Sequence, residues 1–264
     1  MLEIISYGTA GDRPALLFVH GAFHSARCWE HHFLPWFAAR GREAHAVSLR
    51  GHGRSSGNLR VERPGLADYA ADVETAMDRI GRPCVLVGHS MGGVIAQMVR
   101  IRRKDAVGAV LYASSPMRPA LSVVARILKQ RPVDFLRGQV LGDTVAGRRA
   151  FTTFFFPPDL PAALRAQYVA ELTDESPRAL KEVFSRKPPQ TPDLETRPVL
   201  VIGGEHDWSI PMRDNRRLAK TFRAELKACP GAHDMMLDPR WEASAMAIDA
   251  WLDARFAGPA PAAA

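Results

Sequence analysis

Short runs of apolar residues alternate along this chain with segments in which apolar residues recur every three or four positions. The apolar runs in the middle of the chain are continuous rather than alternating, as is typical of parallel strands covered on both faces. The alternation spans the first 115 residues and resumes at about residue 198. The candidate strands cover residues 2–7, 15–19, 43–49, 83–87, 107–113, 198–202 and 224–228.

Between these runs the spacing predicts helices. One apolar stripe has the three- and four-residue spacing of an amphipathic helix and consists of Leu66, Tyr69, Val73, Ala76, Met77 and Ile80. A terminal helix is predicted over residues 243–256, with Met246, Ala250 and Leu252 on its inner side. Strands that alternate with helices require right-handed crossovers. The sequence therefore predicts an α/β fold, a mostly parallel twisted sheet flanked by helices.

Residues 116–197 break this rhythm. They hold ten of the twenty prolines and show no convincing buried strand. Helical patterns cover residues 119–130, 144–155, 160–172 and 177–186. We interpret the segment as a helical cap inserted between two strands of a core made of residues 1–115 and 198–257. The remaining residues, 258–264, are expected to be disordered.

The composition fits a globular protein of this size. The 264 residues are 47% hydrophobic and 24% charged, which is ordinary for a domain with a substantial core. The longest apolar runs have the length of strands, so no stable membrane insertion is predicted. The start of the chain shows no secretory signal. The three cysteines, Cys28, Cys84 and Cys229, form no metal or disulfide pattern, and a cytoplasmic location is expected.

The chain is basic, with 35 Lys and Arg against 28 Asp and Glu, a net charge of +7 and a pI near 9.7. Its arginines are scattered through most segments. The densest cluster, residues 100–104, would close a helix, where cations complement the helix dipole. Nucleic acid is therefore not predicted as a partner, and the sequence leaves the oligomeric state open.

A candidate nucleophile stands in the run Gly88-His89-Ser90-Met91-Gly92-Gly93. The run follows a predicted strand and precedes a predicted helix, which is the context of a nucleophile elbow. On such a sharp turn a serine hydroxyl projects above the sheet, and the flanking glycines leave room for it. The motif predicts that Ser90 is the nucleophile of a serine hydrolase. An ordinary glycine-rich connection is the alternative.

Acyl transfer also requires two donors for a developing oxyanion. The backbone N–H of Met91, directly after the nucleophile, is one candidate. The second is the N–H of Ala22, in the loop after the strand 15–19, where Gly21 allows a close approach of the backbone. His20 is predicted to fix this loop by hydrogen bonding rather than to act in catalysis.

A serine becomes nucleophilic when a histidine accepts its proton and a carboxylate orients that histidine. Of nine histidines, His233 follows the last strand in a loop, where sheets of this kind present catalytic groups. Asp207 follows the preceding strand, so the order is nucleophile, acid, base. Glu205 and Asp234 are competing acids. Asp234 adjoins His233 and does not easily reach its far nitrogen, whereas Glu205 is nearer the strand end.

The chain resembles the α/β-hydrolase superfamily, in particular its capped esterase and lipase-like members. The matching positions are His20, Gly21 and Ala22, the loop 51–55 (GHGRS), residues 88–93, Gly203 with Asp207, and Gly231 with His233. The run 20–29 (HGAFHSARCW) is also similar to a loop of methylesterases and hydroxynitrile lyases. The resemblance implies the α/β-hydrolase fold with commonly eight strands, whereas we count seven. Haloalkane dehalogenases and epoxide hydrolases of this fold use an aspartate nucleophile, so Ser90 argues against both.

A small-molecule carboxylic ester is the expected substrate, and no cofactor or metal is predicted. The candidate pocket residues are Phe23, His24, Phe151, Phe155 and Trp208. The phenylalanines of the cap are equally expected to pack its helices against the core. Thioester or lactone hydrolysis, lyase or perhydrolase chemistry with the same triad, and a ligand-binding receptor on this scaffold remain alternatives.

Overall fold

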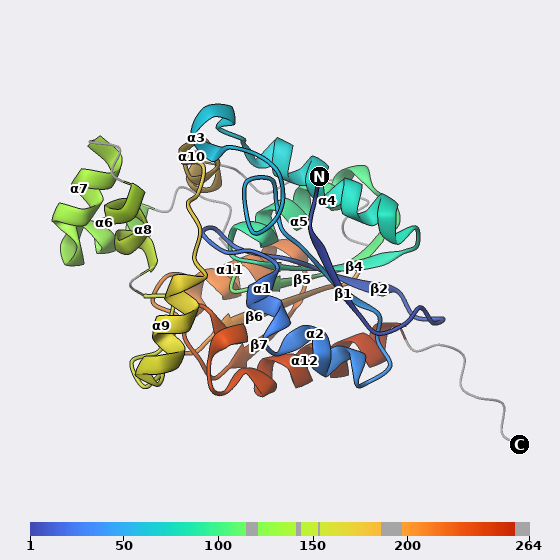
Figure 1. Ribbon diagram of the computed structural model, residues 1–264. Helices are drawn as coiled ribbons and strands as arrows, with labels where there is room; N and C mark the ends of the chain where they lie inside the picture. Colours follow the sequence, from blue (N-terminus) through green and yellow to red (C-terminus); the bar gives the residue numbers. More distant parts are fainter. Residues whose placement is uncertain (115–120, 141–143, 153, 186–196, 257–264) are drawn as a thin grey trace, which may run out of the picture.

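The computed structural model describes residues 1–114, 121–140, 144–152, 154–185 and 197–256 (Figure 1). Its seven described strands form one sheet in the order β1-β3-β2-β4-β5-β6-β7, parallel except that β1 runs antiparallel to β3. The strands are β1 (Ile4–Tyr7), β2 (Ala15–Val19), β3 (Ala44–Val47), β4 (Cys84–His89), β5 (Ala106–Tyr112), β6 (Val199–Gly204) and β7 (Glu225–Cys229). Each matches one predicted run, with ends that shift by at most two residues.

Helices cover both faces of the sheet (Figure 1). One face carries α4 (Leu66–Ile80), α5 (Met91–Arg102) and α11 (Met212–Phe222), and the other carries α1 (Arg27–Glu30), α2 (Phe33–Ala38) and α12 (Trp241–Phe256). In β2, Leu17 packs toward α4 and α5, whereas Leu16 and Phe18 pack toward α1 and α2. Because both faces are covered, the middle strands are apolar without alternation.

Two terminal-helix residues were assigned to the wrong side. The stripe of α4 is buried as predicted at Leu66, Tyr69, Val73, Ala76 and Met77, with Ile80 half-buried. In α12, however, Met246 is 60% exposed and Ala250 is also exposed. The buried face of α12 consists of Ser244, Ala245, Ile248, Trp251 and Leu252. Alanines lie around the whole circumference of α12, so its sequence does not define one apolar stripe, and the bulky Trp251 and Ile248 determine the inner side.

Five helices are described between β5 and β6 in the chain, and we call these helices, α6–α10, the inserted helices. They are α6 (Leu121–Gln130), α7 (Pro132–Val140), α8 (Thr144–Thr152), α9 (Ala162–Ala170) and α10 (Pro177–Ser185). Four correspond to predicted helices. The fifth, α7, was not predicted and packs against α8. The predicted start of the cap, residue 116, and the predicted tail, residues 258–264, lie outside the described part, whereas the predicted end of the cap, residue 197, lies two residues before β6.

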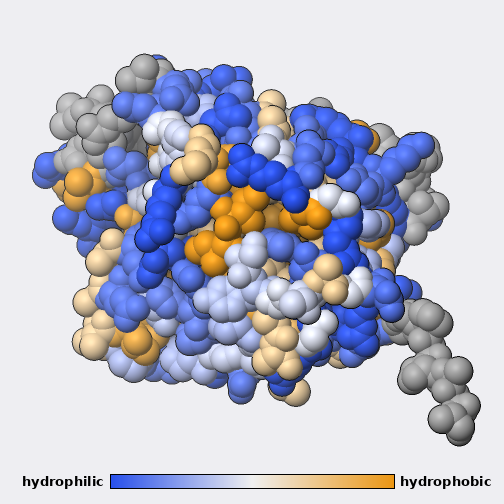
Figure 2. Space-filling model, turned by 45° about the vertical axis from the view of Figure 1, so that its right-hand side comes forward, coloured by the Kyte–Doolittle hydropathy of each residue, from blue (hydrophilic) through white to orange (hydrophobic). Residues whose placement is uncertain are grey.

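The remaining short elements are α3 (Leu59–Glu62) and the 3-10 helix η2 (Met235–Leu237). None of the described helices has the length and apolar character needed to cross a membrane. Figure 2 shows a face that is mostly hydrophilic, with hydrophobic residues gathered near its middle. Such a surface is ordinary for a globular protein, since apolar atoms contribute much of any protein surface.

Candidate active site

The candidate catalytic residues all lie beyond the carboxyl ends of parallel strands. Ser90 directly follows β4, Asp207 follows β6, His233 follows β7, and Ala22 follows β2. Parallel strands present their carboxyl ends at one edge of the sheet, and ligands of open α/β sheets bind at that edge. The fold therefore gathers four segments that are far apart in the sequence.

Ser90 occupies a strained turn between β4 and α5. Its φ is 50° and its ψ −114°, a conformation that costs a residue with a side chain about 1–3 kcal/mol. The turn is possible because backbones approach closely around it. A Cβ on Gly88 would lie 2.4 Å from the Gly92 carbonyl oxygen, and one on Gly92 would lie 2.3 Å from that of Val19. The predicted strand-turn-helix context of Ser90 is thus present.

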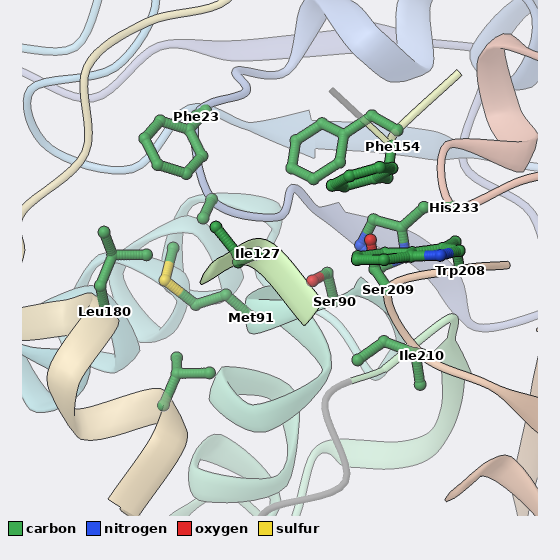
Figure 3. Close-up of a pocket in the computed structure, with 13 residues that line it drawn as sticks. Phe23, Ser90, Met91, Ile127, Phe154, Leu180, Trp208, Ser209, Ile210 and His233 are labelled. Atoms are coloured by element: carbon green, nitrogen blue, oxygen red, sulfur yellow. The ribbon is translucent and has the colours of Figure 1, made fainter. Parts of the chain in front are cut away.

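His233 and Asp207 form a buried hydrogen bond. Nδ1 of His233 lies 2.8 Å from Oδ2 of Asp207, and Oδ1 of Asp207 accepts the backbone N–H of Ile210 at 2.8 Å. An ionised carboxylate can only accept, so Nδ1 carries the hydrogen. This tautomer leaves Nε2 of His233 to accept a proton. Ser90 and His233 line the same pocket (Figure 3).

The surroundings of His233 favour its protonated form. Burial lowers the pKa of His233, but attraction to Asp207, the hydrogen bond that His233 donates to Asp207 and the charge of Asp234 outweigh burial. Together they raise the pKa of His233 above its usual value. The sequence left the sign of this balance undecided. An imidazolium at this position is therefore stabilised when His233 takes up a proton.

The two candidate oxyanion donors are the backbone N–H groups of Ala22 and Met91. Among the described hydrogen bonds, none uses the backbone N–H of Ala22 or Met91. Gly21 is required next to Ala22, since a Cβ there would lie 2.6 Å from Nδ1 of His89. His20 accepts the Leu49 N–H at 3.1 Å and donates to the Gly21 carbonyl at 2.8 Å. The prediction that His20 fixes this loop by hydrogen bonding is confirmed.

A second buried histidine–aspartate pair lies beside the first, and the sequence did not reveal it. Nε2 of His24 is 3.0 Å from Oδ2 of Asp234, and both side chains are buried. Asp234 is therefore not the partner of His233. His24, which was predicted to line the pocket, turns its imidazole to Asp234 and is not among the described lining residues. The two residues are 210 positions apart, and no local pattern marks the pair.

Three potential metal ligands also meet here. His89, His233 and Asp234 offer ligand atoms within 4.8 Å of one another. Nε2–H of His89 donates to the His233 carbonyl oxygen at 3.2 Å. Burial, followed by the charges of neighbouring histidines, holds the pKa of His89 well below its usual value. These contacts account for a neutral His89 as a structural support of the His233 loop.

The pocket above Ser90 is mostly apolar and spans about 570 Å³, including the part open to solvent. In Figure 3, Phe23, Met91 and Leu180 lie on one side of Ser90, with Trp208 and Ile210 on the other. The described lining comprises Ala22, Phe23, Ser90, Met91, Ile127, Phe154, Phe155, Leu180, Val183, Trp208, Ser209, Ile210 and His233. No Asp, Glu, Lys or Arg is among these residues.

Of the predicted pocket residues, Phe23, Phe155 and Trp208 line this pocket. The side chain of Phe151 is outside the described part of the structure. Phe154 also belongs to the lining and stacks on Trp208, with ring centroids 3.7 Å apart. Phe156 instead packs in the core with Tyr168. Of the phenylalanines between α8 and α9, Phe154 and Phe155 therefore line the pocket, and Phe156 packs in the core.

The chain belongs to the Alpha/beta hydrolase family, whose model matches residues 16–245. It is 28% identical to a monoacylglycerol lipase of Mycolicibacterium smegmatis over 259 residues, covering 91% of this chain and 88% of the relative. It is 25% identical to epoxide hydrolase 3 of Xenopus tropicalis, covering 84% of this chain and 66% of that protein. A bromoperoxidase from Bacillus anthracis has a similar structure, with a TM-score of 0.76, 19% identity, and coverage of 96% and 95%. These similarities support a hydrolase.

Proposed function

We propose that this protein is a serine esterase that cleaves carboxylic esters with Ser90 as nucleophile, His233 as general base and Asp207 as its orienting acid. One observation carries the proposal. Ser90 stands on a turn where its φ is 50°, and it shares an apolar pocket with His233. Nδ1 of His233 lies 2.8 Å from Oδ2 of the buried Asp207. Such a set activates a serine hydroxyl, which is otherwise a weak nucleophile.

The mechanism follows from these positions. Oγ of Ser90 attacks the ester carbonyl carbon while Nε2 of His233 takes its proton, and the N–H groups of Ala22 and Met91 stabilise the oxyanion. The intermediate collapses, the C–O bond to the alcohol breaks, and His233 returns the proton to the leaving alkoxide. Water then attacks the acyl-enzyme with His233 again as base, releasing the acid and restoring Ser90.

The pocket favours a neutral, apolar ester. A charged substituent would lose its hydration and find no ionic partner among the described lining residues. Epoxide hydrolases also match this chain. Epoxide hydrolases of this fold use an aspartate nucleophile, whereas this chain has Ser90 at that place, which favours ester hydrolysis.

The test is turnover of p-nitrophenyl esters of graded acyl length by wild type and Ser90→Ala. We expect hydrolysis by the wild type, and loss of nearly all of it in the variant, because alanine lacks the hydroxyl that attacks the ester. A fluorophosphonate probe should label the wild type and not Ser90→Ala. Circular dichroism of both proteins checks that the variant folds.

Undiminished turnover in Ser90→Ala, or labelling that persists in it, would contradict the assignment of the nucleophile. Hydrolysis of thioesters or lactones in preference to open-chain esters would change the substrate class and leave Ser90 in place. Labelling without turnover of any ester would point to a non-hydrolytic use of the triad or to a receptor.

A further inference from the structure

Glu175, in the segment between α9 and α10, carries a fully buried carboxylate that the mechanism above does not use. Its Oε2 accepts Nε2–H of His52 at 3.1 Å and the backbone N–H of Phe23 at 3.4 Å. Its Oε1 accepts the Tyr69 hydroxyl at 2.6 Å and the Ser176 N–H at 2.7 Å. A buried carboxylate is costly unless it is paired and hydrogen-bonded, and here four donors from separate segments converge on it.

The partner of Glu175 is a charged histidine. Nδ1 of His52 faces the Arg50 carbonyl oxygen at 3.0 Å, and Nε2 faces Glu175. Both oxygens only accept, so both nitrogens carry hydrogen and the ring is an imidazolium. Burial lowers the pKa of His52, but attraction to Glu175 and hydrogen bonds outweigh it and raise the pKa. His20, whose ring centroid lies 5.0 Å away, has a pKa well below its usual value because of burial and the charge of His52.

The same segment holds the loop that follows β2. The Thr173 N–H donates to the Phe23 carbonyl at 2.8 Å, and the Thr173 hydroxyl donates to the His24 carbonyl at 3.3 Å. Both polar groups of the Phe23 backbone are therefore bound by residues 173–175. Phe23 has a φ of 68°, a left-handed conformation that a residue with a side chain adopts only when its surroundings hold it there.

These contacts fix the orientation of Ala22. The planar peptide group that contains the Ala22 N–H also contains the Gly21 carbonyl oxygen, which His20 binds at 2.8 Å. The next peptide group contains the Phe23 N–H, which Glu175 binds. With both planes held, the two backbone dihedral angles of Ala22 are held as well. An oxyanion donor is effective only when it is oriented before the charge develops.

We propose that Glu175 is a positioning residue for the oxyanion hole, through which the segment between the inserted helices α9 and α10 sets the direction of the Ala22 N–H. The inference rests on the proposed function, since it assigns Ala22 a role in stabilising an oxyanion. It follows that the inserted segment contributes to the chemical step as well as to the pocket wall, and that displacing it weakens catalysis before it weakens binding.

The test compares two substitutions of the same chemistry. Glu175→Gln keeps the shape of the side chain but has one accepting oxygen. That oxygen can accept hydrogen bonds either from Phe23 and His52 or from Tyr69 and Ser176. The NH₂ group then faces the other two donors. Glu182→Gln is the matched control. Glu182 also joins an inserted helix to the core, accepting the Leu66 N–H at 2.8 Å at the start of α4 and the Arg178 side chain at 2.9 Å.

The readouts are kcat and KM for p-nitrophenyl acetate and butyrate, the rate of Ser90 labelling by a fluorophosphonate, and the melting temperature. For Glu175→Gln we expect kcat and the labelling rate to fall at least about tenfold, a part of the 100-fold to 1000-fold that loss of a donor causes. KM should stay near its wild-type value, the signature of an interaction made in the transition state. Glu182→Gln should keep the wild-type kcat, even where its melting temperature falls.

A folded Glu175→Gln with wild-type kcat and labelling rate would overturn the proposal, and so would an equal loss of kcat in Glu182→Gln. If Glu175→Gln does not fold, Tyr69→Phe removes one donor that orients the carboxylate, and it should lower kcat with KM retained. An unchanged kcat in Tyr69→Phe would then count against the proposal. Labelling by the fluorophosphonate does not require an ester substrate. A wild type that is labelled but hydrolyses no ester would contradict the proposed ester hydrolysis. The labelling rates of wild type and Glu175→Gln would still test the role of Glu175.

Discussion

Asp207 uses its two carboxylate oxygens for two different donors, the imidazole of His233 and the backbone N–H of Ile210. Asp207→Asn keeps the size of the side chain but has one accepting oxygen. If that oxygen stays with Ile210, the NH₂ group faces Nδ1 of His233 and favours the wrong tautomer. We expect kcat for p-nitrophenyl esters to fall on the order of 10⁴-fold, by analogy with the protease triad.

The control for this substitution is Glu205→Gln. Glu205 is exposed and lies two residues before Asp207, so its substitution should leave kcat within about twofold, as for a surface position away from the reacting atoms. The opposite result, with Glu205→Gln inactive and Asp207→Asn active, would mean that the acid is misassigned.

The raised pKa of His233 predicts where activity is lost in acid. His233 must be neutral to accept the proton of Ser90, so kcat/KM should fall as the pH drops through the pKa of the free enzyme. Because that pKa lies above its usual value, we expect the midpoint of the acid limb above about 6.5. The measurement is a kcat/KM profile from pH 5 to 9 with an activated ester.

His233→Gln should remove this limb together with nearly all activity. A flat profile over the same range, measured where chemistry limits the rate, would contradict a histidine base. A midpoint well below 6 would mean that burial outweighs the two carboxylates near His233.

Single residues also show what a sequence can reveal about this site. Ser90 and Asp207 were predicted because each follows an apolar run that is readily identified as a strand, and His233 because it stands in a loop between the last predicted strand and the terminal helix. The pairing of His24 was not predicted, because its partner, Asp234, lies 210 positions away. Glu175 received no prediction, since its bond to the Phe23 N–H spans 152 positions and nothing in the run around it differs from a polar loop.

The junction between β2 and α5 depends on Gly92. A Cβ there would lie 2.3 Å from the Val19 carbonyl oxygen and 2.6 Å from that of His20, and both are backbone atoms that cannot rotate away. We expect Gly92→Ala to destabilise the fold by at least about 1–3 kcal/mol, the usual cost of overpacking, and to displace the turn that carries Ser90. Urea unfolding followed by circular dichroism measures the change.

Gly11→Ala is the matched control, because a Cβ at Gly11 meets no atom within 4 Å. It should leave the midpoint of urea unfolding almost unchanged. Equal stability of Gly92→Ala and wild type would show that β2 and α5 separate more easily than their close contact indicates.

Strands and helices were predicted best where the spacing of apolar residues in the sequence matches the buried positions. The middle strands were located within two residues because both of their faces are covered, whereas the edge strands β1 and β7 are partly exposed. The helix α4 has one apolar stripe, and its buried face was predicted correctly. In contrast, α12 carries alanine on all sides, and α7 includes Arg137, Gly138 and Gln139 among its apolar residues, so neither gives a clear helical period.

For the molecule as a whole, the order of elements was enough to predict a mostly parallel sheet with a site at the carboxyl ends of its strands. The strand order was not predictable in detail, since any apolar run can pair with any other. The contacts of residues 173–175 with the loop after β2 were equally hidden, because they depend on how the inserted helices dock.

The position of the inserted helices in the chain has a consequence for biosynthesis. β5 and β6 are hydrogen-bonded neighbours in the sheet, but all five inserted helices are translated between them. At a translation rate of about 5–20 residues per second, the edge of β5 stays without its partner strand, β6, for on the order of ten seconds. Through that interval the apolar run AVGAVLY of β5 offers unpaired backbone groups to any neighbouring nascent chain. Protection of this edge until β6 has been synthesised is therefore expected to raise the yield of folded protein.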